Sequence, residues 1–118
     1  MREELRDRGR LQHMQEAIGN AFEFTNGLTF ENYCTNKVLH FAVVKVLEIV
    51  GEAAYMLSKQ FKAQHPEVEW HKIIAMRHVM VHGYYQIEDE EVWAIIHNDL
   101  PPLQLQINEL LSQAVIEQ

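Results

Sequence analysis

The sequence predicts an all-α protein folded as an antiparallel up-and-down helical bundle, with residues 1–118 forming a single domain. Three observations support this. Apolar residues recur at three- and four-residue steps, the period of an amphipathic helix. No segment keeps the apolar/polar alternation of a strand, and Gly, Pro and Asn fall between the periodic segments, which favours short loops. A chain of 118 residues that is 47% hydrophobic is also long enough to bury one core.

The first helix is expected over residues 2–25. Its apolar stripe consists of Leu11, Met14, Ile18, Ala21 and Phe22. Asn26-Gly27 is typical of a helix end. A short helical turn is expected to begin after Thr29, because a threonine side chain can accept a hydrogen bond from the first turn of a helix.

The second long helix is expected over residues 36–64, where no Gly-Pro break interrupts the pattern. Its apolar residues point in nearly every direction around the helix axis. Such a helix must be surrounded, so we expect it to be the central element, covered by its own domain and by a partner chain. His65-Pro66 is expected to end it.

Three further segments complete the predicted bundle. A helix over residues 70–82 ends at Gly83, and the acidic run 88–91 suits the start of a short helix that carries Val92 and Trp93. Asp99-Leu100-Pro101 is expected to restart the chain into the last helix.

The net charge of −7 is concentrated at one end of the chain. Residues 88–118 contain seven acidic residues and no Lys or Arg, whereas residues 1–87 contain ten acidic and ten basic residues. A globally acidic protein is a poor non-specific binder of nucleic acid, because such binding neutralises phosphates. Any RNA contact must therefore be local, and the acidic third is expected to face away from RNA or toward a basic partner.

Several protein classes are excluded by pattern. The longest apolar run, residues 46–57, contains Glu48, Gly51 and Glu52, so no membrane span is expected. The first 15 residues are charged and do not resemble a secretory signal. The single cysteine, Cys34, is expected to be a small packed residue in a reducing compartment. Cytoplasmic residence is the corresponding prediction.

The richest polar cluster lies within residues 76–85, where Arg77, His78, His82, Tyr84 and Tyr85 surround a glycine. Active sites are commonly built from such clusters of titratable and cationic side chains. On an ideal helix Arg77 and Tyr84 lie within about 20° of each other, but Arg77 and His82 are about 140° apart. Either Gly83 releases Tyr84 from helical geometry, or the site is completed across a dimer interface.

Taken alone, this cluster does not establish a site. An Arg and a His five residues apart are common by chance, so a surface arginine and a helix-capping histidine explain them as well. His78 and His82 have the i, i+4 spacing of a zinc-binding pair, but the sequence offers no third ligand at a matching spacing. We therefore expect no metal and no cofactor.

Four further segments accompany the cluster and carry a family resemblance. The motif R-x4-H-x-Y is matched by Arg77, His82 and Tyr84. The sequence resembles the HepT-like ribonuclease toxins of the HEPN superfamily, whose helix segment resembling N-L-E-I-I-G-E-A corresponds to residues 46–53. The family's P-x-x-x-W, acidic-V-W and N-D-L-P segments correspond to residues 66–70, 92–93 and 98–101.

The match includes three departures. Val46 replaces a usual Asn, His78 replaces a commoner Asn or Asp after the arginine, and Glu88 replaces an expected Asp. The Val46 departure removes any supporting hydrogen bond at that position. The three motif residues themselves are intact.

The resemblance implies a HEPN-like homodimer that acts as a metal-independent endoribonuclease on tRNA or mRNA. In that reading His82 is the general base or acid, Arg77 stabilises the charge on phosphorus, and His78 gives possible support. It also implies a toxin-antitoxin pair, in which a minimal nucleotidyltransferase antitoxin transfers AMP to the motif tyrosine. Tyr84 is the expected modification site, with Tyr85 as the adjacent alternative.

Two other functions compete with this reading. The first is a non-catalytic helical interaction protein that binds and neutralises a partner nucleotidyltransferase, but a pure binding surface does not require Arg77 and His82. The second is a nucleotide-binding regulator, which lacks the glycine-rich loop that cradles phosphate.

Overall fold

The computed structural model describes residues 2–83 and 86–116 of the chain, and no strand occurs within these residues. The fold is an all-α helical bundle, as predicted. Its helical segments, in chain order, are α1 (Arg2–Thr25), α2 (Phe30–Cys34), α3 (Lys37–Met56), α4 (Lys59–Gln64), α5 (Trp70–His82), α6 (Asp89–Ala94), η2 (Ile95–Asp99) and α7 (Leu100–Ile116).

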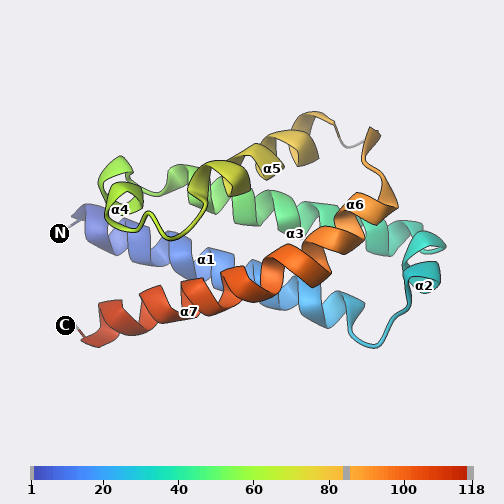
Figure 1. The fold of residues 1–118 in the computed structure, drawn as a ribbon, viewed down its shortest axis with the longest axis horizontal. Helices are drawn as coiled ribbons and strands as arrows, with labels where there is room; N and C mark the ends of the chain where they lie inside the picture. Colours follow the sequence, from blue (N-terminus) through green and yellow to red (C-terminus); the bar gives the residue numbers. More distant parts are fainter. Residues whose placement is uncertain (1, 84–85, 117–118) are drawn as a thin grey trace.

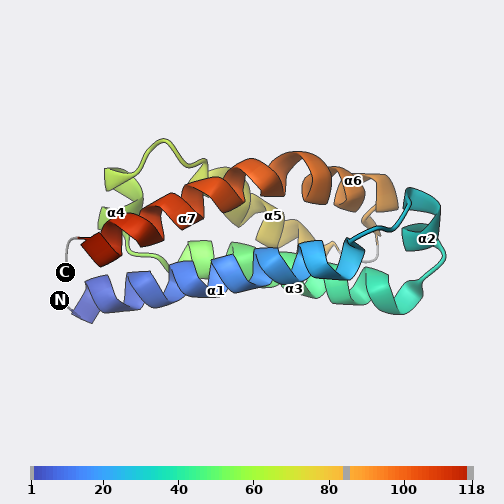
Figure 2. The same cartoon turned by 90° about the horizontal axis from the view of Figure 1, so that it is seen from below.

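Four long helical segments run along the length of the molecule, which measures 46 × 28 × 21 Å. Figure 1 shows that α1, α3, α5 and the α6–α7 segment alternate in direction, which is up-and-down topology. The short helices α2 and α4 lie at opposite ends, and the start of α1 and the end of α7 both lie toward the α4 end (Figure 2). Helix α3 packs against both α1 and α5, so it is the central element, as expected.

The prediction of one helix over residues 36–64 was wrong, because the chain breaks at Leu57 and Ser58. Leu57 takes an extended conformation, with ψ of 146°, and Ser58 becomes the N-cap of α4. The carboxylate of Asp7 accepts hydrogen bonds from Ser58 N at 2.8 Å and from Ser58 Oγ at 2.7 Å. The sequence has no Gly or Pro at this break. The break forms without them because the Asp7 side chain of α1 stabilises it.

The last two helices are not separated by a loop, which corrects the predicted restart at Asp99-Leu100-Pro101. The chain passes from α6 through the π-helical turn η2 directly into α7, and Leu100 N–H bonds to Ile95 O, five residues back. Pro101 and Pro102 have no N–H to donate to the preceding turn. The wider π turn accommodates this loss without ending the helix.

One hydrophobic cluster joins all the long helices. Its largest fully buried side chains include Tyr33, Leu11, Met14, Ile18 and Leu47. Cys34 is exposed, so the prediction that it is packed was wrong. Cys34 is the last residue of the short helix α2, which buries only Tyr33. Among the described residues, no helix is both long and apolar enough to cross a membrane.

The outer face of α3 exposes four apolar side chains, with Lys45 between Phe41 and Ile49 on the same side. Val38, Phe41, Ile49 and Met56 are 80%, 56%, 37% and 46% exposed, and they follow one another at helical spacing along a single stripe. The opposite face of α3 is in the core, where Val43, Leu47 and Val50 are fully buried. Half of the central helix is thus covered within the described chain, and the other half faces outward.

Candidate active site

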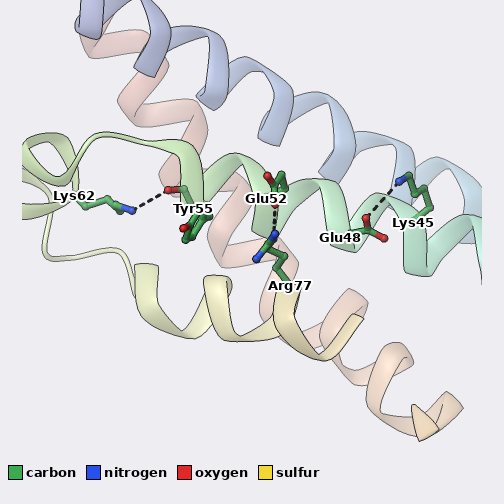
Figure 3. Close-up of polar contacts among 6 residues, drawn as sticks. All are labelled: Lys45, Glu48, Glu52, Tyr55, Lys62 and Arg77. Atoms are coloured by element: carbon green, nitrogen blue, oxygen red, sulfur yellow. Dashed lines mark hydrogen bonds and ion pairs between the residues drawn. The ribbon is translucent and has the colours of Figure 1, made fainter. Parts of the chain in front are cut away.

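Arg77 lies at the contact between α5 and α3. Its Nε donates a hydrogen bond to Glu52 Oε2, and the two side chains form an ion pair (Figure 3). Its Cζ atom is 5.1 Å from the centroid of the Tyr55 ring, within cation–π range. Glu52 and Tyr55 are three residues apart on α3, so they lie on the same side of that helix. At the same end of α3, Lys62 Nζ donates to the carbonyl oxygen of Tyr55 at 3.3 Å.

Gly51 allows the backbones of α3 and α5 to meet at this point. A Cβ atom at position 51 would lie 2.2 Å from Arg77 Cβ and 2.8 Å from Arg77 Cα. Neither atom can rotate away, because one is in the backbone and the other is bonded to it. Only a residue without a side chain fits there. Gly51 therefore sets where the Arg77 side chain begins, and Glu52 sets where it points.

The Arg77 guanidinium retains capacity to bind a ligand. An arginine has five N–H donors, and the one on Nε is used by Glu52. Within residues 2–83 and 86–116, its terminal nitrogens make no further hydrogen bond, and the side chain is 28% exposed. Paired terminal N–H groups match two oxygens of a phosphate. The site is thus suited to an anionic ligand.

His82 lies on a different side of α5. Its ring packs against the ring of His78, with centroids 4.7 Å apart, and both residues are exposed. In the described part of the chain, no hydrogen bond or ion pair joins His82 to Arg77. The described residues also contain no group of three or more His, Cys, Asp or Glu side chains placed to hold a metal ion. One copy of the chain therefore leaves the arginine and the histidine apart.

Gly83 ends α5, as predicted. Its N–H donates to Val79 O at 2.8 Å, and its own carbonyl accepts from Gln86 N at 2.9 Å. Tyr84 and Tyr85 lie outside the described residues, so the third member of the motif and its alternative are located only by their place in the sequence.

The chain that follows these tyrosines is anchored by His40. His40 Nδ1 is 3.1 Å from Asp89 Oδ1, at the start of α6, and 2.9 Å from the hydroxyl oxygen of Tyr33 in α2. Burial raises the pKa of the Tyr33 phenol well above its ordinary value, and the Asp89 charge adds to this. The three side chains tie α2, α3 and α6 together. No local sequence pattern connects these three residues.

Glu52 and Tyr55 were likewise not predicted as partners of Arg77. One available signal was Gly51 itself, because a glycine inside an otherwise apolar helix often marks close backbone approach. The Val46 departure has a structural explanation as well. Val46 is 6% exposed and belongs to the hydrophobic cluster, where an apolar side chain needs no hydrogen-bond partner.

Comparison with known proteins places this arrangement in a family. Residues 14–110 match the family described as ribonuclease HepT-like. The chain belongs to the HepT-like ribonuclease family. The matched range includes α3 and α5, and therefore both sides of the Arg77 contact.

Individual relatives agree with the family assignment. This HepT-like chain is 34% identical over 100 residues to a probable ribonuclease HepT of Thermococcus cleftensis, covering 85% of this chain and 91% of the relative. It is 33% identical over 103 residues to a putative RNase of Caldanaerobacter subterraneus subsp. tengcongensis, covering 87% and 92%. A putative RNase of Methanocaldococcus jannaschii is 28% identical over 97 residues, covering 82% and 89%. No solved structure gives a significant match.

Proposed function

We propose that this HepT-like chain is a metal-independent endoribonuclease and the toxin of a toxin-antitoxin pair, acting as one domain in the cytoplasm. The observation that carries the proposal is the state of Arg77. Its guanidinium is oriented by Glu52 and Tyr55, while its terminal N–H groups remain available for a phosphate. The relatives are named as a probable ribonuclease and a putative RNase, and these names support RNA as the substrate.

The proposed reaction uses the ribose 2′-hydroxyl as the nucleophile. A histidine takes the 2′-hydroxyl proton, the 2′-oxygen attacks phosphorus, and the bond to the 5′-oxygen breaks as that oxygen receives a proton. The products are a 2′,3′-cyclic phosphate and a 5′-hydroxyl. His82 acts as the base or the acid, and Arg77 stabilises the negative charge on the phosphoryl oxygens. His78, in contact with His82, supports the orientation of its ring.

The proposed active form is a homodimer. The exposed apolar stripe of α3 supports this, because an unpaired stripe of that length is typical of an association surface. Glu52, which pairs with Arg77 of α5, follows Ile49 by three residues and precedes Met56 by four, so it lies on the same side of α3 as the stripe. Pairing two copies across it supplies each site with side chains from both chains. This offers a way to bring together an arginine and a histidine that do not meet within one chain.

Control by an antitoxin is the second part of the proposal. A minimal nucleotidyltransferase partner transfers AMP to Tyr84, which adds negative charge and bulk where RNA phosphates must bind. Tyr84→Phe should leave the toxin insensitive to the partner, while Tyr85→Phe remains sensitive. Intact-mass and peptide mass spectrometry after incubation with ATP would locate the AMP, and its presence on Tyr85 alone would contradict the assignment.

The decisive experiment is cleavage of total bacterial RNA by purified protein in excess EDTA. Intact mass must first confirm that no AMP is attached. His82→Ala should lower the cleavage rate by about 10²–10⁴-fold, the usual contribution of a general acid or base. His71→Ala is the matched control, because His71 is also exposed and lies on a similar side of α5. Intact RNA with unmodified wild-type protein would instead favour the non-catalytic interaction protein.

A further inference from the structure

One side of α5 packs on α3. Another side of α5 forms one wall of an open groove, which the proposed ribonuclease site does not use. The groove has a volume of about 500 Å³ and lies between α5 and the continuous segment of α6, η2 and α7. Its α5 wall is made by Ile73, Met76, Val79 and Met80. On the helix, Met76 and Met80 lie about 160° from His78, so this part of the groove wall faces away from His78.

The floor of the groove is apolar and buried, and part of its wall is exposed to solvent. Ile73, Met80, Leu100 and Leu103 are at most 9% exposed, whereas Val79 is 45% exposed. Two methionines line the groove, and methionine side chains adapt to differently shaped apolar ligands. From Glu69 to Val79 the α5 wall is about 15 Å long at 1.5 Å per residue. This length matches between two and three turns of a helix.

The rim of the groove is acidic. Glu69, Glu91 and Asp99 are exposed lining residues, and Lys72 is the basic residue among them. The whole segment of residues 88–118, which supplies the second wall, contains no Lys or Arg. Such a rim repels RNA phosphates and attracts cationic side chains. A second copy of this chain, with net charge −7, is a poor occupant for the same reason.

We propose that this groove is a docking site for a basic amphipathic helix of a partner protein. Apolar side chains of that helix fill the space over Met76, Met80 and Leu103, and flanking Lys or Arg side chains face Glu69, Glu91 and Asp99. This is helix-in-groove recognition, in which buried apolar residues give affinity and rim charges select the partner. Binding in this groove does not require Arg77, His82 or ribonuclease activity.

The test measures binding of three helical peptides of equal length to the full chain. The peptides share leucines at helical spacing and differ only at the remaining positions, which carry Lys and Arg, Gln, or Glu. The basic peptide should bind most tightly and the acidic peptide most weakly. Equal affinity for all three peptides, or no binding of the basic one, would overturn the proposal.

The binding position can be read from methyl-labelled methionines by NMR. The basic peptide should shift the methyl signals of Met76 and Met80, while Met14 in the core and Met56 on the outer face of α3 stay in place. A shift confined to Met56 would place the peptide elsewhere and overturn the proposal. Shifts of Met76 and Met80 that follow protein concentration without peptide would make a second copy the occupant, which also overturns it.

Charge reversal supplies the matched variants. The double substitution Glu69→Lys with Glu91→Lys should lower the affinity for the basic peptide by about tenfold or more, because like charges then face each other. Glu16→Lys with Glu23→Lys makes the same charge change at exposed positions of α1 and should leave affinity unchanged apart from general screening. If the reversed variant fails to fold, Glu69→Gln with Glu91→Gln keeps the side-chain shape and should still weaken binding. Equal losses in the two pairs would contradict groove binding.

Discussion

Two carboxylates hold neighbouring elements near the end of α3, and they are used in different ways. Asp7 is 6% exposed, and both of its oxygens accept hydrogen bonds from Ser58. The Glu52 side chain is 47% exposed and accepts a hydrogen bond from Nε of Arg77 alone. The first junction is saturated within the chain, so it stabilises the fold. The second leaves donors available, so it is suited to binding a ligand.

The largest expected effect on this comparison is that of Asp7→Ala. The substitution removes two hydrogen bonds to a charged group and leaves the Ser58 N–H unpaired, so the free energy of unfolding should fall by about 3 kcal/mol. Urea denaturation measures this. Glu16→Ala, on the exposed side of the same helix, should change it by less than about 0.5 kcal/mol. Similar losses for the two variants would remove the contrast between the junctions.

Gly51→Ala tests whether the site depends on close packing of α3 and α5. The added methyl group meets Arg77 Cα and Cβ, so the two helices must separate. We expect a loss of about 2 kcal/mol in unfolding free energy and lower ribonuclease activity, because Arg77 moves with α5.

Gly19→Ala is the matched control for this change. An added Cβ at Gly19 meets nothing within 4 Å, so the greater helix propensity of alanine should stabilise the protein by about 0.5–1 kcal/mol. The same sign of change at both glycines would show that the contact at Gly51 yields easily.

Glu52→Ala separates function from stability at the second junction. The half-exposed ion pair should contribute less than about 1 kcal/mol to folding. Loss of arginine orientation should nevertheless lower kcat/KM for RNA by about tenfold. Glu48→Ala is the control, because Glu48 lies on the same side of α3 and pairs with Lys45 at 3.4 Å. If Glu52→Ala lowers stability but keeps ribonuclease activity, the proposed role of Glu52 in function is contradicted.

The smallest expected effect concerns pH and the Tyr33–His40–Asp89 contacts. Because the pKa of Tyr33 is raised in the folded protein, the folded state keeps a proton that the unfolded state loses above about pH 10. Its contribution to stability is therefore complete below pH 10 and declines above it, by at most about 1.4 kcal/mol per pH unit.

Tyr33→Phe should be less stable than wild type at neutral pH by about 1 kcal/mol and should lose this alkaline dependence. Thermal melts at a series of pH values would show the two curves converging above pH 10. Tyr55→Phe, at an exposed position, should keep the wild-type slope. Parallel curves for Tyr33→Phe and wild type would contradict the assignment.

The amino-acid sequence by itself determined the helical elements and the motif. The periodic stripes, the Thr29 cap, Gly83 and the acidic start of α6 are local signals. The structure confirmed the elements that they predicted, except for the break within residues 36–64 and the continuous passage from α6 into α7. The motif residues Arg77 and His82 could also be recognised from the sequence, because a motif is defined by spacing along the chain and not by packing.

Only the tertiary structure decided which side chains meet. The break at Ser58 depends on Asp7, which is 51 residues away, and the orientation of Arg77 depends on Glu52, which is 25 residues away. The groove along α5 exists because α5 packs on α3 and leaves its second side toward η2 and α7. Helical periodicity describes contacts within one helix, whereas these features depend on the distances between helices, which local patterns do not contain.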